Sequence, residues 1–158
     1  MKFTPGDIKG VIKEELARYE DKRGWLIEVF RQDELLEDLY PLMGYISLTH
    51  PGVTRGPHEH RFQWDHFVFL GSSAFRLLLW DNRPSSPTYQ NQLILTAEEG
   101  HPLRVVIPPG IVHAYQNRGE KSGLVLNFPN QLYRGWGKKE EVDEIRWEER
   151  KDSPFVVE

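Results

Sequence analysis

The feature that most constrains the fold is a series of short apolar segments, each closed by Gly, Pro, Asn or Asp. Within these segments the side chains follow a period of two, which is typical of strands because successive side chains point to opposite faces. Thirteen Gly and eleven Pro supply the turns that many short strands need. The predicted strands are Trp25–Phe30, Gly44–Thr49, Phe67–Leu70, Phe75–Trp80, Tyr89–Thr96, Leu103–Ile107, Ile111–Tyr115 and Leu124–Phe128.

Eight or more strands at this spacing predict an all-β sandwich or barrel. Short helices are expected only at the periphery, at Asp33–Tyr40 and Lys138–Glu144. The chain shows no internal repeat, low-complexity tract or linker. We therefore expect residues 1–158 to form one domain.

Composition excludes several classes of function. The net charge of the 158 residues is -4, which argues against a nucleic-acid groove, because phosphate binding needs clustered Lys and Arg. The absence of cysteine excludes disulfides, a Cys nucleophile and Cys-ligated metal clusters. Neither a signal peptide nor an apolar run near the ~20 residues of a membrane span is present. A cytoplasmic protein without membrane partners is expected.

The densest group of reactive side chains lies in Gly52–His66. His58 and His60 point to the same face if this segment is a strand. Far along the chain, Pro108–His113 is followed by Asn117, and a sandwich interior can bring such distant strands together. Two imidazoles on one strand face, beside an Arg and a Pro-Gly turn, indicate a pocket. The remaining histidines lack this context and are interpreted as structural or solvated: His50, His66 and His101.

Two kinds of chemistry could use this group. One is a metal site, because His58, His60, Asp65 and His113 have the spacing of the two signature motifs of metal-binding cupins, and their side chains suit a divalent first-row metal. The other is metal-free acid–base catalysis, with a neutral His as base and Arg55 stabilising an oxyanion. Spacing alone does not choose between them.

Several segments, in order from about Asp7 to Tyr133, resemble the dTDP-4-dehydrorhamnose 3,5-epimerase family of the cupin superfamily. The segment with Ser86–Tyr89 is the most specific of these. The resemblance implies a cupin-type jelly roll, also called a double-stranded β-helix, that needs no metal and no other cofactor. The matching segments are Asp21–Gly24 with Glu28 and Phe30, Arg55–His58, Asp81 and Arg83 with Ser86–Tyr89, and Pro108–Gly110 with His113 and Asn117.

The resemblance also implies a reaction and its catalytic residues. The substrate is a nucleotide-diphosphate 4-keto-6-deoxysugar, whose carbonyl acidifies the protons on the neighbouring carbons. His58 matches the base, and Arg55 is expected near the sugar and the developing enolate charge. The family's proton-donating Tyr falls on Asn127, so Tyr133, which aligns with a second Tyr of the family, is the expected substitute.

The substrate-binding residues are implied in the same way. Arg23 matches an Arg that contacts the diphosphate, often across a dimer interface, and Glu28 matches a nucleotide contact. A homodimer is therefore expected. Glu59 or Asp65 is the expected carboxylate that orients the catalytic imidazole. The other residues expected to line the substrate pocket are Tyr45, Ser47, His60 and His113.

The sequence thus predicts an isomerase, an epimerase of a nucleotide sugar in polysaccharide or glycan synthesis. Three alternatives stay open. Arg55–Arg61 also resembles the dTDP-sugar 3,4-ketoisomerases, and the paired His58 and His60 fit that motif. A metal-dependent cupin could use the same histidines. Loss of the Tyr at Asn127 also fits a sugar-nucleotide-binding protein without catalysis.

Overall fold

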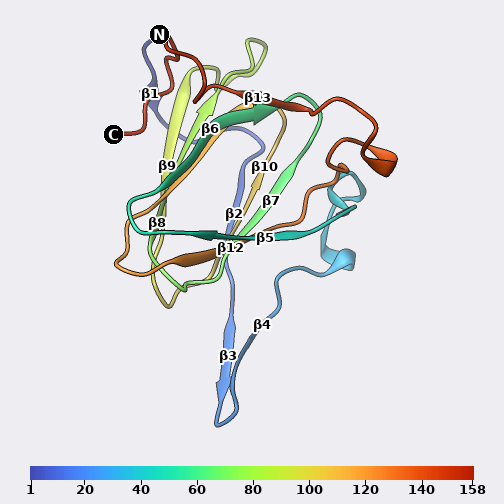
Figure 1. Cartoon of the computed structure of the whole chain (residues 1–158), viewed down its shortest axis with the longest axis vertical. Coiled ribbons are helices and arrows are strands. Elements are labelled where there is room, and N and C mark those ends of the chain that lie inside the picture. The colour runs from blue at the N-terminus through green and yellow to red at the C-terminus, as the bar shows by residue number, and fades with distance from the viewer.

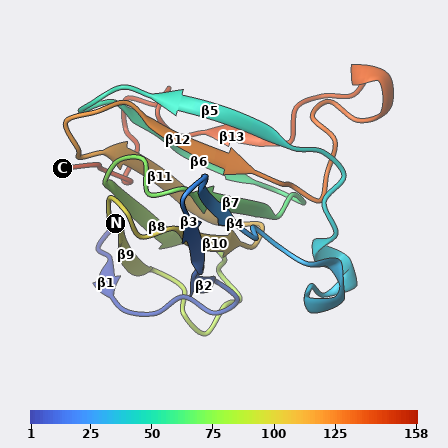
Figure 2. The ribbon, with the colours of Figure 1, turned by 90° about the horizontal axis from the view of Figure 1, so that it is seen from below.

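The computed structural model covers all 158 residues and contains two β-sheets packed face to face, with a hairpin that projects away from them (Figure 1). Figure 2 shows the two layers, with β5 and β12 in one and β8 and β9 in the other. Strands distant in sequence are neighbours in both sheets, as in a jelly roll. The all-β prediction is confirmed.

The order of the strands across each sheet differs from their order along the chain. From edge to edge, the six-stranded sheet contains β1 (Thr4–Pro5), β9 (Asn91–Ala97), β8 (Phe75–Asp81), β11 (Ile111–Asn117), β6 (Thr54–His60) and β13 (Glu144–Arg146). The five-stranded sheet contains β2 (Ile12–Glu15), β10 (Leu103–Ile107), β7 (Asp65–Phe69), β12 (Gly123–Asn127) and β5 (Tyr45–Thr49). The projecting hairpin contains β3 (Arg18–Asp21) and β4 (Gly24–Ile27).

The core lies between the two sheets and is built from the inward residues of the alternating strands. Phe69 on β7 packs against Phe75 and Tyr115, with ring centroids 5.3 and 5.6 Å apart. Burial of such rings is the dominant favourable term in folding. A second cluster covers the outer face of the six-stranded sheet, where Trp80 packs against Phe155 near the C-terminus.

The outer surface of the other sheet and the projecting hairpin carry exposed apolar side chains. On β5 and β12 they are Ile46, Leu48 and Leu124, and on the hairpin they are Tyr19, Trp25 and Leu26. Single exposed apolar residues are ordinary, but a contiguous group of them indicates an interaction surface.

The two predicted helices differ from the structure. Asp33–Tyr40 contains two 3₁₀ turns, η1 (Gln32–Glu34) and η2 (Glu37–Leu39), because only Leu39 is buried and no apolar stripe supports an α-helix. The prediction for Lys138–Glu144 is wrong: a third turn, η3 (Trp136–Lys138), shares only Lys138 with this segment, and Glu144 begins β13. Pairing with the edge of β6 overrides the local pattern. Every helical segment is a single 3₁₀ turn, so none could cross a bilayer.

Candidate functional site

An open pocket of about 1130 Å³ is lined by β5, β6, β13 and the segment between Gln131 and Glu144. Phe67 and Tyr115 belong both to the core and to the pocket lining, so the core forms part of the pocket wall. The volume is slightly above the range of about 300–1,000 Å³ that is typical of small-molecule sites. Six predicted site residues line this pocket: Tyr45, Ser47, Arg55, His58, His60 and Tyr133.

A β-bulge in β6 places the two principal catalytic candidates on the same face. His58 pairs with His113 and Arg55 pairs with Tyr115, so two residues of β6 oppose one residue of β11. Gly56 makes this possible: its φ is +84°, and a Cβ there would lie 2.5 Å from the carbonyl oxygen of His113. Because the bulge shifts the alternation by one residue, Arg55 and His58 both face the pocket although they are three positions apart.

Three imidazoles meet beside the pocket. The rings of His58 and His113 pack edge to face with centroids 4.5 Å apart, and ring nitrogens of His58, His60 and His113 lie within 4.8 Å of one another. Nδ1 of His113 lies 3.0 Å from the carbonyl oxygen of Ile111, to which it donates its proton. Its buried Nε2 lies 3.3 Å from Oδ2 of Asp65 and makes no hydrogen bond. The structure thus brings together all four residues of the metal hypothesis.

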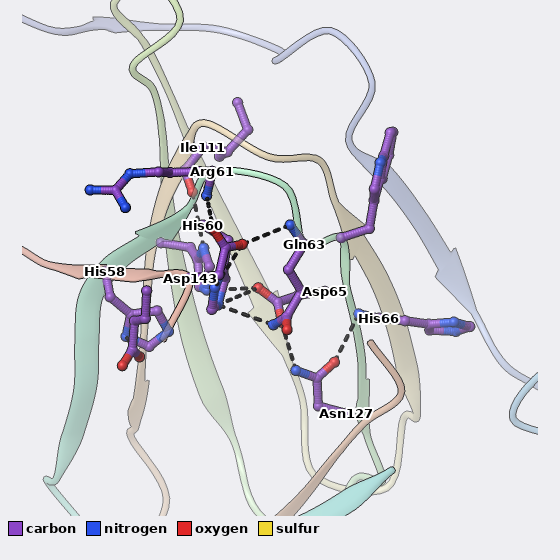
Figure 3. Close-up of polar contacts among 12 residues, drawn as sticks. His58, His60, Arg61, Gln63, Asp65, His66, Ile111, Asn127 and Asp143 are labelled. Atoms are coloured by element: carbon purple, nitrogen blue, oxygen red, sulfur yellow. Dashed lines mark hydrogen bonds and ion pairs between the residues drawn. The ribbon is translucent and has the colours of Figure 1, made fainter. Parts of the chain in front are cut away.

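Asp65 is buried beneath this cluster and held by two amides. Nε2 of Gln63 donates to its Oδ1 at 2.9 Å, and Nδ2 of Asn127 donates to the same oxygen at 2.7 Å (Figure 3). Burial by itself would raise the pKa of Asp65, but the adjacent histidines and the Asn127 amide hold it below its ordinary value. Burial lowers the pKa of His113 to about 3, and the nearby His58 contributes to this shift. Near neutral pH the site therefore combines a carboxylate with a neutral His113.

His58 is positioned by two carboxylates that come from the C-terminal part of the chain. Its Nδ1 lies 3.6 Å from Oε1 of Glu144 and 3.7 Å from Oε1 of Glu148. Burial alone would lower the pKa of His58, but Glu148, Glu144 and Asp65 outweigh this and raise it. Glu148 in turn has a lowered pKa, since its interaction with His58 outweighs its partial burial.

The expectation that Glu59 orients His58 is wrong, because alternation along β6 turns Glu59 to the opposite face. There its Oε1 accepts hydrogen bonds from Nδ2 of Asn82 and Nε1 of Trp147, both at 3.0 Å. Asp65 lies against Nε2 of His60, 3.4 Å away, rather than against Nδ1 of His58. The partners of Nδ1 are therefore the glutamates contributed by and beside β13.

Arg55 connects the two sheets at the rim of the pocket. Its Nε donates to Oγ1 of Thr49 and its Nη2 donates to the carbonyl oxygen of Leu48, both at 2.9 Å. These bonds hold the guanidinium between β6 and β5. Since Arg carries five N–H donors, others stay available to a bound oxyanion.

Three predicted substrate contacts are absent from the pocket lining of this chain: His113, which is buried behind His58, and Arg23 and Glu28, which lie at or next to the hairpin. Arg23 is in the turn of the hairpin and pairs with Asp21 at 2.5 Å. Glu28 follows β4 and lies 3.9 Å from Arg31. The hairpin of β3 and β4 projects away from the sandwich (Figure 1), and neither Arg23 nor Glu28 is among the residues that line the pocket with His58. The third peripheral candidate, Tyr133, does line the pocket, but its side chain is half exposed.

Several pocket residues escape prediction from the sequence. Asp143 fixes the loop after β6, because its carboxylate accepts the backbone N–H groups of Arg61, Phe62 and Gln63. Nothing local distinguishes Asp143 or Glu144 from the surrounding acidic residues, whose pattern is typical of a solvated helix face. Only the long-range pairing of β13 with β6 reveals them. Further charged pocket residues without a sequence signal are Arg134, Lys138 and Glu148.

The fold and pocket define a cupin-type jelly roll whose imidazole-lined pocket is suited to acid–base chemistry on a small molecule. Comparison with known proteins then identifies the group within this class. The family profile described as dTDP-4-dehydrorhamnose 3,5-epimerase matches residues 5–151, so the chain belongs to this family. It is accordingly an enzyme of the isomerase class, an epimerase acting on a nucleotide sugar.

Individual relatives agree with this assignment. A probable low-salt glycan biosynthesis epimerase from Haloferax volcanii is 36% identical over 129 residues, covering 80% of this chain and 81% of the relative. A spore coat polysaccharide biosynthesis protein from Bacillus subtilis is 30% identical over 126 residues, covering 80% and 82%. The crystal structure of a dTDP sugar isomerase from Desulfovibrio desulfuricans has a TM-score of 0.78 at 20% identity, covering 94% and 91%. This likeness confirms the predicted cupin-type fold.

Proposed function

We propose that the enzyme inverts a carbon beside the ketone of a nucleotide-linked 4-keto-6-deoxysugar, with His58 as the base. The observation that carries this proposal is the placement of His58 on the pocket wall with Nδ1 facing Glu144 and Glu148. An Nδ1–H directed at a carboxylate fixes the tautomer and leaves the lone pair of Nε2 free. The imidazole is thereby oriented to accept a proton from a bound sugar.

The reaction proceeds through an enolate. Nε2 of His58 takes the proton, the C–H electron pair forms a carbon–carbon double bond, and the carbonyl electrons move onto oxygen. The Arg55 guanidinium, anchored between the sheets, stabilises that oxygen. Delivery of a proton to the other face of the same carbon restores the ketone and inverts the configuration. Tyr133, which lines the pocket, stays a candidate for this delivery.

The pocket also carries groups suited to a diphosphate. Arg61, Arg134 and Lys138 all line it, and guanidinium and ammonium groups bind phosphate oxygens through charge-assisted hydrogen bonds. The names of the two relatives refer to glycan biosynthesis and to spore coat polysaccharide biosynthesis. This supports a substrate that is a nucleotide sugar used to build a surface polymer. A cytoplasmic location, where such precursors would be made, stays a prediction that cell fractionation can test.

The direct test follows deuterium from heavy water into a 4-keto-6-deoxysugar nucleotide. Wild-type enzyme is expected to label a carbon beside the ketone and to invert it, and His58→Ala is expected to abolish labelling. His101→Ala, a change outside the pocket lining, is the matched control and should keep wild-type labelling. Absence of labelling by the wild type with every 4-keto sugar nucleotide tried would overturn the proposal.

The same assay separates two of the open alternatives. A 3,4-ketoisomerase would move the carbonyl from C4 to C3, which product analysis by nuclear magnetic resonance detects. A protein that has lost catalysis would bind the nucleotide sugar and produce no exchange.

Metal binding is a second candidate use of the same side chains. Ring nitrogens of His58, His60 and His113 lie within 4.8 Å of one another, and Oδ2 of Asp65 faces two of these histidines. Imidazole and carboxylate donors fit a divalent first-row metal, which would polarise a substrate oxygen. Elemental analysis of the purified protein tests this: a stoichiometric metal whose removal abolishes turnover would replace the metal-free proposal.

We also infer that the enzyme works as a homodimer in which the hairpin of one subunit docks onto the other. Trp25 and Leu26 of the hairpin are 53% and 62% exposed, which a free hairpin does not require. Docking would also bring Arg23 and Glu28 to the pocket of the partner. Trp25→Ser with Leu26→Ser is expected to shift the protein from dimer to monomer in sedimentation. A monomeric wild type would contradict the inference.

A further inference from the structure

Inversion needs an acid on the pocket wall that faces the base. Because the base lies on the six-stranded sheet, we expect the acid to come from the five-stranded sheet. His58 lies on β6 of the six-stranded sheet. Across the pocket, β5 contributes two hydroxyl groups to the lining, those of Tyr45 and Ser47. The Ser47 hydroxyl is already engaged with the hydroxyl of Tyr115, 3.0 Å away. Tyr45 is therefore the hydroxyl of this wall to consider.

The position of the Tyr45 hydroxyl is set by Asn127, which is directly opposite it in the β5–β12 pairing. Oδ1 of Asn127 accepts the backbone N–H of His66 at 2.8 Å, which fixes the orientation of the amide. Nδ2 therefore faces inward and donates to Asp65 at 2.7 Å and to Oη of Tyr45 at 2.9 Å. Figure 3 shows Asn127 between His66 and Asp65.

This arrangement leaves the phenolic proton of Tyr45 free. Both N–H groups of the fully buried Asn127 amide are used, one by a carboxylate and one by the phenol oxygen. Because the phenol oxygen accepts from Asn127, its own O–H can point into the pocket. The same N–H stabilises the phenolate that forms when that proton leaves.

We propose that Tyr45, positioned by Asn127, is the acid that returns a proton to the face of the sugar opposite His58. This proposal rests on the proposed epimerase reaction. The phenol O–H bond breaks, the electron pair of the enolate forms the new C–H bond, and the carbonyl is restored. His58 then releases its proton and the Tyr45 phenolate regains one, both by exchange with water through the open pocket.

The other two tyrosines of the pocket fit this role less well. Tyr115 lies on β11, in the same sheet as His58, and its hydroxyl is paired with Ser47. Tyr133 is exposed to a similar extent as Tyr45, but its only side-chain contact of this kind runs from the backbone N–H to Sδ of Met43, so no hydrogen bond orients its phenol. Burial of the Tyr45 hydroxyl and the charge of Asp65 raise the pKa of Tyr45, and the hydrogen bond from Asn127 opposes this shift because it stabilises the phenolate.

The experiment compares exchange with inversion in heavy water, using a 4-keto-6-deoxysugar nucleotide. Tyr45→Phe is expected to slow inversion by about 10²–10⁴-fold, the usual contribution of a general acid. Exchange of deuterium into recovered, uninverted substrate should persist within a few-fold of wild type, because His58 still removes and returns a proton on its own face. Tyr133→Phe is measured in parallel because it removes the competing phenol of the pocket, and Tyr40→Phe, a change outside the pocket lining, is the matched control that should invert at the wild-type rate.

Each other outcome overturns a defined part of this reasoning. Wild-type inversion by Tyr45→Phe, or a large loss in Tyr133→Phe instead, would remove Tyr45 from the role while leaving the epimerase proposal intact. Loss of exchange and inversion together in a folded Tyr45→Phe, as judged by circular dichroism, would make Tyr45 a structural residue rather than the acid. Absence of exchange in the wild type would refute the epimerase mechanism itself.

Discussion

The role of the β-bulge at Gly56 can be tested by adding one methyl group at this position and measuring the loss in the free energy of unfolding. Gly56 has a φ of +84°, and the carbonyl oxygen of His113 lies 2.5 Å from the position of an added Cβ. The left-handed conformation costs a residue with a Cβ about 1–2 kcal/mol. The contact is with backbone, which cannot rotate away, and overpacking of this kind costs about 1–3 kcal/mol more. We expect Gly56→Ala to lower the free energy of unfolding by about 2–5 kcal/mol.

Gly52 offers a control that separates the two contributions. Its φ is +74°, so Gly52→Ala carries a similar conformational cost, but no atom lies within 4 Å of the added Cβ. Gly52→Ala should therefore lose only about 1–2 kcal/mol. Urea denaturation of both variants measures the difference, which should be about 1–3 kcal/mol.

Turnover gives a second readout of the same perturbation. To relieve the contact, β6 must move away from β11, and this displaces Arg55 and His58 relative to each other. We expect kcat of Gly56→Ala to fall by at least tenfold, while Gly52→Ala stays near wild type. Equal losses of stability in the two variants, or full activity in Gly56→Ala, would refute the role assigned to the bulge.

Two further predictions follow from carboxylates. Glu148→Gln keeps the shape of the side chain but removes the charge that faces His58. In steady-state kinetics its kcat should fall by at least tenfold, with KM little changed. The control Glu149→Gln removes the charge paired with Arg146 and should behave as wild type. Asp81 is fully buried, and hydrogen bonds from Arg83 and neighbouring hydroxyls outweigh the effect of burial and lower its pKa from 3.8 to about 2. The stabilisation of the folded state by the Asp81 carboxylate is therefore complete above about pH 5. It is lost as the pH falls through 4 toward 2, which lowers the free energy of unfolding by about 2 kcal/mol. Urea melts of Asp81→Asn should lack this part of the acid destabilisation, and an identical pH dependence in the variant and the wild type would contradict the assignment.

Strands with an alternating apolar pattern could be predicted from the sequence, and strands held mainly by pairing could not. Ile111–Tyr115 and Leu103–Ile107 are recognisable because their inward side chains fill the core. The segment Ile12–Glu15 is exposed at every position, yet it forms β2 because β10 offers it a hydrogen-bonding edge. No local pattern reports such an edge, since it exists only once the sheet has assembled.

The candidate site divides in the same way. His58, His60 and His113 can be found from the sequence because motif spacing is local, and the pairing of β6 with β11 brings them together. The role of position 127 could not be predicted in this way, because the sequence shows only that Asn127 stands where the family has a tyrosine. In the folded chain that amide lies beside Tyr45, contributed by the neighbouring strand. If Tyr45 is the acid, as we propose, the residue paired with position 127 supplies the function that this position lacks.

The origin of the carboxylates beside His58 shows why the catalytic group could not be completed from the sequence. Glu144 belongs to β13, a three-residue strand held at the sheet edge by pairing with His60, Glu59 and His58 of β6. So short a strand has little stability of its own, and its register is set by β6. The strand that carries the base therefore also positions the carboxylates that orient it. Disruption of this pairing should affect catalysis before it affects the core, because none of the twelve residues of the main cluster comes from β13.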